Sequence, residues 1–178
     1  PGAHAAMVLT EAVDLRIFPS HWRHAFLVEV EGEGGTRRSL QVFDAAGDAV
    51  HKVILRDGSD LAAWERAKAE LASDDQTQIA RVAPREAPEA AKSRPDRADE
   101  LRAEWRKMTD THQFLRMVSK LKMNRLGAYR GAGAPYAEPL APEAVSAMLE
   151  GAAADGVEIM LFVGNAGCIQ IHAGQVET

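Results

Sequence analysis

The sequence predicts an α+β fold, because strand-like and helix-like patterns occupy separate stretches of its 178 residues. Apolar and polar residues alternate through much of the first third, which is typical of strands with one buried face. Between residues 98 and 154, apolar residues recur at spacings of three and four, which is typical of amphipathic helices. Near the C-terminus, two short apolar runs flank a glycine-containing turn and predict a β-hairpin. Such segregation of strands and helices favours α+β over α/β.

The stretch over 7–73 predicts strands followed by one helix. Strands are expected at 13–18, 24–31, 39–43 and 50–55, separated by breaks that contain Pro19, Gly32 to Gly35, and Asp44 to Asp48. In the second of these strands, Phe26, Val28 and Val30 lie on one face. Ser59 or Asp60 can cap a helix that runs to about Leu71.

Residues 74–97 have the composition of a linker. They contain three prolines, five alanines, two glutamates and no aromatic residue. Such a segment has little apolar surface to bury, so we expect it to be solvated.

Residues 98–178 predict four helices and a hairpin. The first two helices are expected around Leu101 to Met108 and Phe114 to Leu121, with Thr109 or Asp110 as the N-cap of the second. Asn124 can cap a third helix that ends at Gly131 and Gly133, and a fourth is expected over 142–154. The hairpin strands are expected at 157–163 and 168–172.

Composition restricts the function and the compartment. The 21 basic and 26 acidic residues give a net charge of -5, which argues against a basic surface for nucleic acid. The single cysteine, Cys168, excludes an intrachain disulfide and fits a reducing compartment such as the cytoplasm. The longest apolar strand-like run, 159–163, is far shorter than the ~20 residues that a membrane span needs. The chain opens on Pro1 without a secretory leader, and we expect it to be a piece of a longer protein.

Several motifs of enzyme chemistry are missing from the sequence. It contains no His-Glu-x-x-His zinc motif, no Cys-x-x-Cys pair and no Walker phosphate loop. It also lacks a serine nucleophile elbow. Cys168 and His172 fall on one face of a strand but are separated by ~13 Å of rise, too far for a nucleophilic pair.

His112 is the first candidate for chemistry. It is expected in the first turn of a helix, beside aromatic and apolar residues. A neutral imidazole there could ligate a metal or haem iron while an acceptor holds its other ring nitrogen. The alternative is a histidine that only helps to cap the helix.

Two arginines are further candidates. Arg16 lies in an alternating strand, where its guanidinium either reaches solvent or points into a cleft and binds an anion or a ligand on iron. Arg125 follows the capping Asn124, which suggests a corner that folds it back toward His112. The alternative for Arg125 is an ordinary surface arginine in the first turn of a helix.

Four blocks of the sequence resemble the HemS/HmuS hemin-transport and hemin-degrading family. Residues 105–114 (WRKMTDTHQF) resemble the segment that carries the haem-ligating histidine, and residues 163–172 (VGNAGCIQIH) resemble the hairpin that follows it. Residues 14–18 (DLRIF) with Trp22, and residues 39–53 (SLQVFDAAGDAVHKV), resemble the later part of the family's first repeat. The blocks occur in the family's order, so the resemblance is specific.

The resemblance implies a large antiparallel β-sheet flanked by helices and a division into two family repeats. Residues 1–73 then form the end of the first repeat, 74–97 a linker, and 98–178 the start of the second. The sheet is expected to be incomplete relative to the full two-repeat protein. Strand edges exposed in this way could be covered by a second copy, so an oligomer is also an expectation.

The resemblance also implies roles for three residues. His112 matches the axial ligand of haem iron, Arg16 the catalytic distal arginine on the opposite haem face, and Arg125 a basic residue near the propionates. The implied function is cytoplasmic haem transport, oxidative haem degradation, or both. The alternative is a non-catalytic chaperone that hands haem to a separate haem oxygenase. A haem ABC transporter is a further implied partner, with no role for nucleic acid or membrane insertion.

Overall fold

The chain forms two compact units in a computed structural model that describes residues 5–77 and 80–177. Unit 1 comprises Pro1–Glu86 and Gly151–Thr178, and unit 2 comprises Ala87–Glu150. Antiparallel sheets and helices occur together, which confirms the predicted α+β class. Among the described residues, no helix combines the length and the apolar character needed to cross a membrane.

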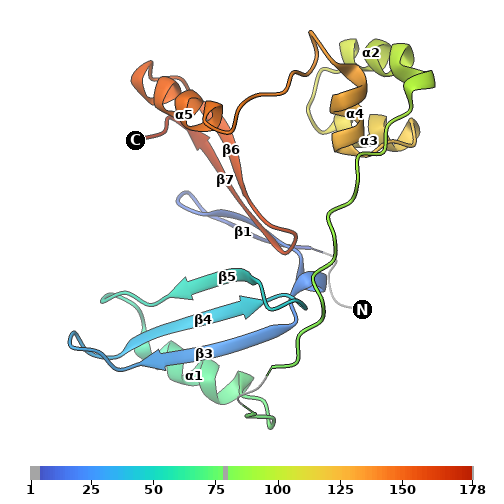
Figure 1. Ribbon diagram of the computed structural model, residues 1–178. Helices are drawn as coiled ribbons and strands as arrows, with labels where there is room; N and C mark the ends of the chain where they lie inside the picture. Colours follow the sequence, from blue (N-terminus) through green and yellow to red (C-terminus); the bar gives the residue numbers. More distant parts are fainter. Residues whose placement is uncertain (1–4, 78–79, 178) are drawn as a thin grey trace. The chain divides into compact units, whose positions relative to one another are not determined.

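The first sheet of unit 1, sheet A, joins strands from the two ends of the sequence. Its order is β1 (Ala6–Leu9), β2 (Asp14–Ile17), β7 (Cys168–Gly174) and β6 (Ile159–Gly164), and all neighbours are antiparallel (Figure 1). The β6–β7 hairpin therefore pairs with β2, about 150 residues earlier in the sequence. The expected repeat limits of 1–73, 74–97 and 98–178 stay a prediction, whereas the compact units place this hairpin with the N-terminal strands.

The second sheet, sheet B, is a meander covered by one helix. It contains β3 (His24–Val30), β4 (Arg37–Phe43) and β5 (Ala49–Ile54). Helix α1 (Leu61–Leu71) lies against it (Figure 1), and the Asp60 carboxylate caps the helix by accepting the Ala63 N–H at 3.0 Å. All four of these elements agree with the sequence predictions to within two residues at their ends.

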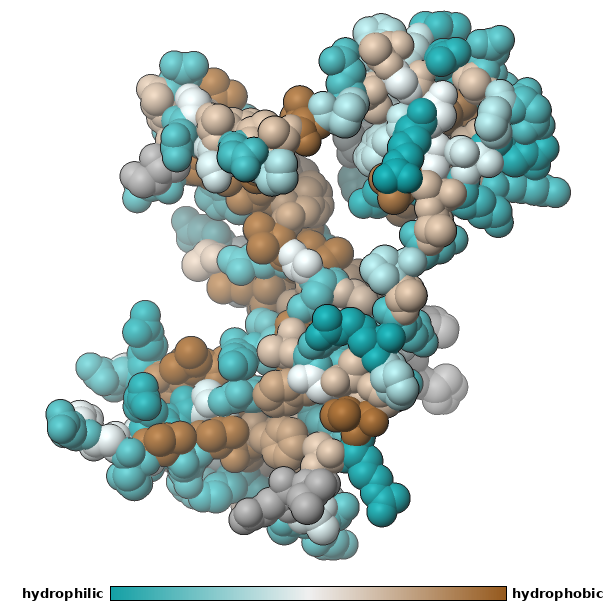
Figure 2. All heavy atoms as spheres, viewed as in Figure 1, coloured by the Kyte–Doolittle hydropathy of each residue, from teal (hydrophilic) through white to brown (hydrophobic). Residues whose placement is uncertain are grey.

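Helix α1 covers the face of sheet B opposite to the one marked by Phe26. Val42 on the covered face is 1% exposed and Trp64 of α1 is buried against it, whereas Phe26 is 42% exposed. Apolar side chains consequently reach the surface along these strands (Figure 2). Both faces of β3 carry apolar residues, so alternation alone did not identify the covered face.

A polar network fixes α1 to β3 through one carboxylate. Glu29 accepts hydrogen bonds from Lys68 Nζ at 2.8 Å, from the Trp64 indole N–H at 3.0 Å and from Arg38 Nε at 2.9 Å. The bond from Lys68, followed by that from Trp64, lowers the pKa of Glu29 from 4.5 to about 2.

Acidification is expected to weaken this attachment. Because the folded-state pKa is below the unfolded one, Glu29 contributes stability above about pH 4.5, and the contribution is lost as the pH falls toward about 2. The free energy of unfolding, measured in urea by tryptophan fluorescence, should therefore be higher for wild type than for Glu29→Gln at neutral pH. The difference between the two proteins should disappear in acid. Glu33→Gln, in the exposed turn before β4, is the matched control. An equal gap at both pH values would contradict this prediction.

The two sheets of unit 1 are joined at the turn of the β6–β7 hairpin. The Gly167 carbonyl accepts the Phe18 N–H at 2.9 Å and the Trp22 indole N–H at 3.0 Å. The Asn165 amide donates to the Val50 carbonyl at 2.9 Å. The glycine turn that the sequence marked as a hairpin is therefore also a contact between sheets.

His51 and Cys168 lie at this junction. The His51 ring stacks on Trp22 with ring centroids 6.3 Å apart, and its Nδ1 is 3.6 Å from Cys168 Sγ. The distant hairpin therefore contacts His51 and covers part of its ring. Cys168 is buried, and burial raises the pKa of its thiol.

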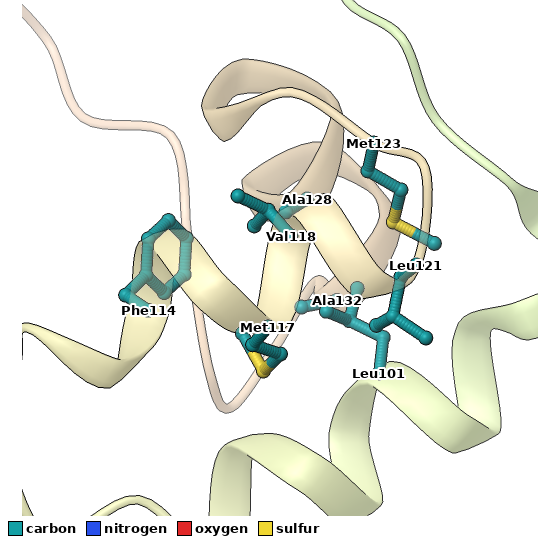
Figure 3. Close-up of a cluster of buried hydrophobic side chains, with 8 residues drawn as sticks. All are labelled: Leu101, Phe114, Met117, Val118, Leu121, Met123, Ala128 and Ala132. Carbon is teal, nitrogen blue, oxygen red and sulfur yellow. The ribbon is translucent and has the colours of Figure 1, made fainter.

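Unit 2 contains three short helices around one apolar core. They are α2 (Ala98–Arg106), α3 (Gln113–Lys120) and α4 (Arg125–Ala132), and a single-turn 3₁₀ helix (Pro95–Arg97) precedes them. Helix α5 (Ala144–Ala154) follows and leads into β6. The core consists of eight buried residues from α2, α3, α4 and the connection between the last two (Figure 3): Leu101, Phe114, Met117, Val118, Leu121, Met123, Ala128 and Ala132. Five of these eight lie in the two stretches for which the sequence predicts the first two helices, 101–108 and 114–121.

The corner between α3 and α4 confirms the predicted break before Arg125. Lys122 has a left-handed φ of 57°, and the N–H groups of Lys122 and Met123 return to the carbonyls of Ser119 and Val118. This pattern is a Schellman motif, which ends a helix. Asn124 then caps α4 by accepting the Gly127 N–H at 2.8 Å, as the sequence predicts.

The linker is anchored to unit 2 rather than wholly solvated. Asn124 accepts the Lys92 N–H at 2.9 Å through its side chain, donates its own N–H to the Lys92 carbonyl, and donates its amide to Ala90. A Cβ on Gly127 would lie 2.0 Å from the Lys92 oxygen, so only glycine permits this approach. Residues 74–77 and 80–94 contain no helix or strand, in agreement with their composition.

Candidate functional site

His112 occupies the N-cap position of α3. The helix begins at Gln113, so the expectation that His112 lies in its first turn was wrong by one position. The side chain is 91% exposed, and its Nδ1 lies 2.7 Å from Oδ1 of Asp110. The imidazole is therefore held at one nitrogen while the rest of the ring faces solvent.

Side chains fix the loop that carries this histidine. Asp110 Oδ1 also accepts the His112 backbone N–H at 2.7 Å. Gln113 accepts the Thr109 N–H at 3.1 Å and donates to the Thr109 hydroxyl at 3.2 Å. The backbone bond from His112, followed by the ring bond, lowers the pKa of Asp110. Asp110 thus binds the residue that precedes the helix, whereas a conventional N-cap would bind an N–H inside the first turn.

Aromatic residues form the base of this loop. The Phe114 ring lies 5.1 Å from that of Trp105 and 5.2 Å from that of Tyr129, measured between centroids. Phe114 is only 8% exposed, and Met117 is also buried in the core. Both side chains therefore belong to the buried core of the helices, on which the loop that carries His112 rests.

Arg16 lies near the middle of sheet A. Its guanidinium pairs with both carboxylate oxygens of Asp14, two residues earlier on the same face of β2. The side chain is 31% exposed, intermediate between the two environments that the sequence allowed. By strand register this face also carries exposed apolar side chains from the two outer strands, β1 and β6: Met7, Leu9, Met160 and Phe162. An ion pair on an apolar sheet face can hydrogen-bond a flat ligand that covers it.

Arg125 is the first residue of α4, and its side chain is exposed. His112 and Arg125 both belong to unit 2, whereas Arg16 belongs to unit 1. The prediction that the three surround one ligand therefore stays a prediction. Unit 2 has depressions of about 220 Å³ beside Gln113 and about 740 Å³ beside Tyr129, and none of the three residues lines either one.

Sequence reasoning did not identify two carboxylates at these positions. The sequence predicts Asp110 only as a possible helix cap and indicates no role for Asp14. Each lies two residues before its partner, a spacing that favours contact in a turn or along one face of a strand. In residues 5–77 and 80–177, no three His, Cys, Asp or Glu side chains are grouped to hold a metal ion. His112 can thus supply one bond to a metal whose other ligands come from elsewhere.

A family model described as the haemin-degrading HemS.ChuX domain matches residues 1–71 and 122–178. The hemin transport protein HmuS of Yersinia pestis is 37% identical over 175 residues, which cover 98% of this chain and 50% of that protein. The hemin transport protein HemS of Yersinia enterocolitica is 37% identical over 176 residues, with the same coverage. The chain therefore spans about half the length of these relatives.

Solved structures of haem-binding proteins have the same fold as this chain over about half of their own length. Holo-PhuS, a heme-binding protein from Pseudomonas aeruginosa, superposes with a TM-score of 0.83 at 39% identity, over 97% of this chain and 50% of that one. ChuS, a heme degrading enzyme from Escherichia coli O157:H7, superposes with a TM-score of 0.77 at 36% identity, over 99% and 51%. The predicted architecture of antiparallel sheet and flanking helices is thereby confirmed.

Proposed function

The chain belongs to the family of haemin-degrading HemS.ChuX domains, and from this membership we propose that it binds haem, with His112 as the axial ligand of the iron. The observation that carries the proposal is the state of this side chain. It is 91% exposed, yet one ring nitrogen is held by Asp110. An imidazole restrained at one nitrogen and open at the other has the form of a metal-ligating histidine.

Arg16 and Arg125 would act on other parts of the same ligand. The Arg16 guanidinium has five N–H donors, of which Asp14 takes only some, so others remain for a group bound on the far side of the iron. Exposed apolar residues beside Arg16 would cover the porphyrin face. Arg125 would pair with a propionate carboxylate. Bound haem would supply redox-active iron, and the three side chains would hold and orient it.

Haem titration tests the binding proposal directly. Ferric haem added to the chain should give a saturable one-to-one complex, with a Soret band displaced from that of free haem. Excess imidazole should compete for the coordination position and alter that band. A spectrum that stays that of free haem at every ratio would contradict the proposal.

Oxidative haem degradation is the second candidate function, favoured by the donors on Arg16 and by the description of ChuS as a heme oxygenase. A carrier should keep its haem when reductant, oxygen and catalase are added, whereas a degrading enzyme should lose the Soret band and form a bilin-like product. Arg16→Ala should then slow that loss more than Arg37→Ala, an exposed arginine on β4. Equal rates for the two variants would remove Arg16 from the reaction.

A place in haem uptake in the cytoplasm completes the proposal. The single cysteine is buried and unpaired, which is compatible with a reducing compartment. A haem ABC transporter upstream, or a separate haem oxygenase downstream, would be the partner of a carrier. Transfer of haem from the loaded chain to an apo-oxygenase, followed by the Soret bands of the two proteins, distinguishes a chaperone from a degrading enzyme.

A further inference from the structure

We propose that Asp110 is a positioning residue that selects the tautomer of His112 and directs its Nε2 lone pair away from the protein. The inference rests on the proposed function in one respect, which is that the metal bound by His112 is haem iron. The arrangement of the two side chains is independent of that function.

The hydrogen bond itself determines which ring nitrogen carries the proton. Asp110 Oδ1 is 2.7 Å from His112 Nδ1. An ionised carboxylate only accepts hydrogen bonds, so Nδ1 must be the donor. In the neutral ring, Nε2 then has no proton and offers its lone pair. Free histidine prefers the opposite tautomer, in which Nε2 is protonated and cannot bind a metal without losing that proton.

The same oxygen also fixes the direction of the ring. Asp110 Oδ1 accepts the backbone N–H of His112 at 2.7 Å, which anchors the carboxylate to the turn. With the carboxylate anchored, the bond to Nδ1 restrains rotation of a side chain that is otherwise 91% exposed. The Thr109–Gln113 pair closes the turn on both sides of Asp110 and His112. A ligand held in one orientation loses less side-chain entropy on coordination.

The tautomer can be measured without haem. Long-range ¹H–¹⁵N correlation spectra at about pH 9, where histidine side chains are neutral, report which ring nitrogen is protonated. Wild type should show His112 protonated mainly at Nδ1, and Asp110→Ala should shift it toward protonation at Nε2. Asp99→Asn is the matched control, since it removes one exposed carboxylate of unit 2 outside this turn. A tautomer that is the same in wild type and Asp110→Ala overturns the proposal.

The haem complex gives a second readout. Removal of the partner of a ligating histidine typically costs roughly 10–100-fold in metal affinity, and we expect this loss for ferric haem in Asp110→Ala. Asp110→Asn keeps an acceptor oxygen but removes the charge, so it should retain much of the affinity and raise the reduction potential of the iron. Unchanged affinity and potential in both variants would also overturn the proposal. If wild type itself binds no haem, the proposed function fails, while the tautomer measurement still decides the role of Asp110.

Discussion

Replacing His112 with alanine is expected to weaken ferric haem binding by more than about 100-fold and to abolish the Soret spectrum of a histidine-ligated complex. The reason is that loss of the ligand should exceed the roughly 10–100-fold typical of losing only its hydrogen-bond partner. The exposed ring contributes little to folding, so the unfolding midpoint should stay close to that of wild type. Equilibrium haem titration and denaturation of the same preparation measure both effects.

His172→Ala is the matched control for this variant. His172 is also exposed, but it lies in β7, and its Nε2 is 2.9 Å from the Gln175 carbonyl. The His172→Ala protein should bind ferric haem with the affinity and the Soret spectrum of wild type. An His112→Ala protein with normal affinity and spectrum would assign the iron bond to another side chain and end the proposed function in its present form.

Leu121→Ala should be the most destabilising of the substitutions considered in unit 2. Leu121 is 0% exposed and lies where α2, α3 and α4 meet (Figure 3). Truncation removes buried methyl groups and leaves a cavity, which costs about 2–5 kcal/mol in the free energy of unfolding. With three short helices around one core, unit 2 has few other contacts that could compensate. Urea denaturation followed by helical circular dichroism measures the loss.

Leu115→Ala provides the comparison within α3. Leu115 is 56% exposed and lies outside the buried cluster, so its truncation should change the free energy of unfolding by no more than about 0.5 kcal/mol. Similar losses for the two leucines would contradict the assignment of the core.

Local chemistry determined the part of the fold that the sequence predicted well. Asp60 and Asn124 cap the helices they were expected to cap, and the helix end at Gly133 was also expected. Each of these features depends on bonds within about five residues. The buried stripe of α3 followed from helical spacing for the same reason.

Long-range pairing determined what the sequence did not predict. The covered face of β3 depends on where α1 packs, and the environment of His51 depends on a hairpin more than 100 residues later. The hydrogen bond between Lys92 and Asn124 likewise joins the linker-like stretch to the start of helix α4, about 30 residues later. Propensity and periodicity carry no information about such partners.

The candidate site divides in the same way. Residue chemistry alone allowed His112 to be a helix-capping residue and Arg16 and Arg125 to be surface arginines. The motif around His112 was the reason to prefer a haem ligand. The bond from the His112 backbone to Asp110 could have been predicted from the sequence, because an aspartate side chain commonly accepts the backbone N–H of the residue two positions later. The second bond of Asp110, to the imidazole ring of His112, depends on the side-chain conformations of both residues and is seen only in the structure.

The pairing of β2 with β7 has a consequence for biogenesis. During synthesis the ribosome releases β1 and β2 long before the hairpin that pairs with them, while unit 2 lies between and has mostly local contacts. Helical segments of low contact order form quickly, whereas distant strands must wait for their partner. Unit 2 should therefore form before β2 pairs with β7, and the exposed apolar side chains of β1 and β2 are left without that partner in the meantime.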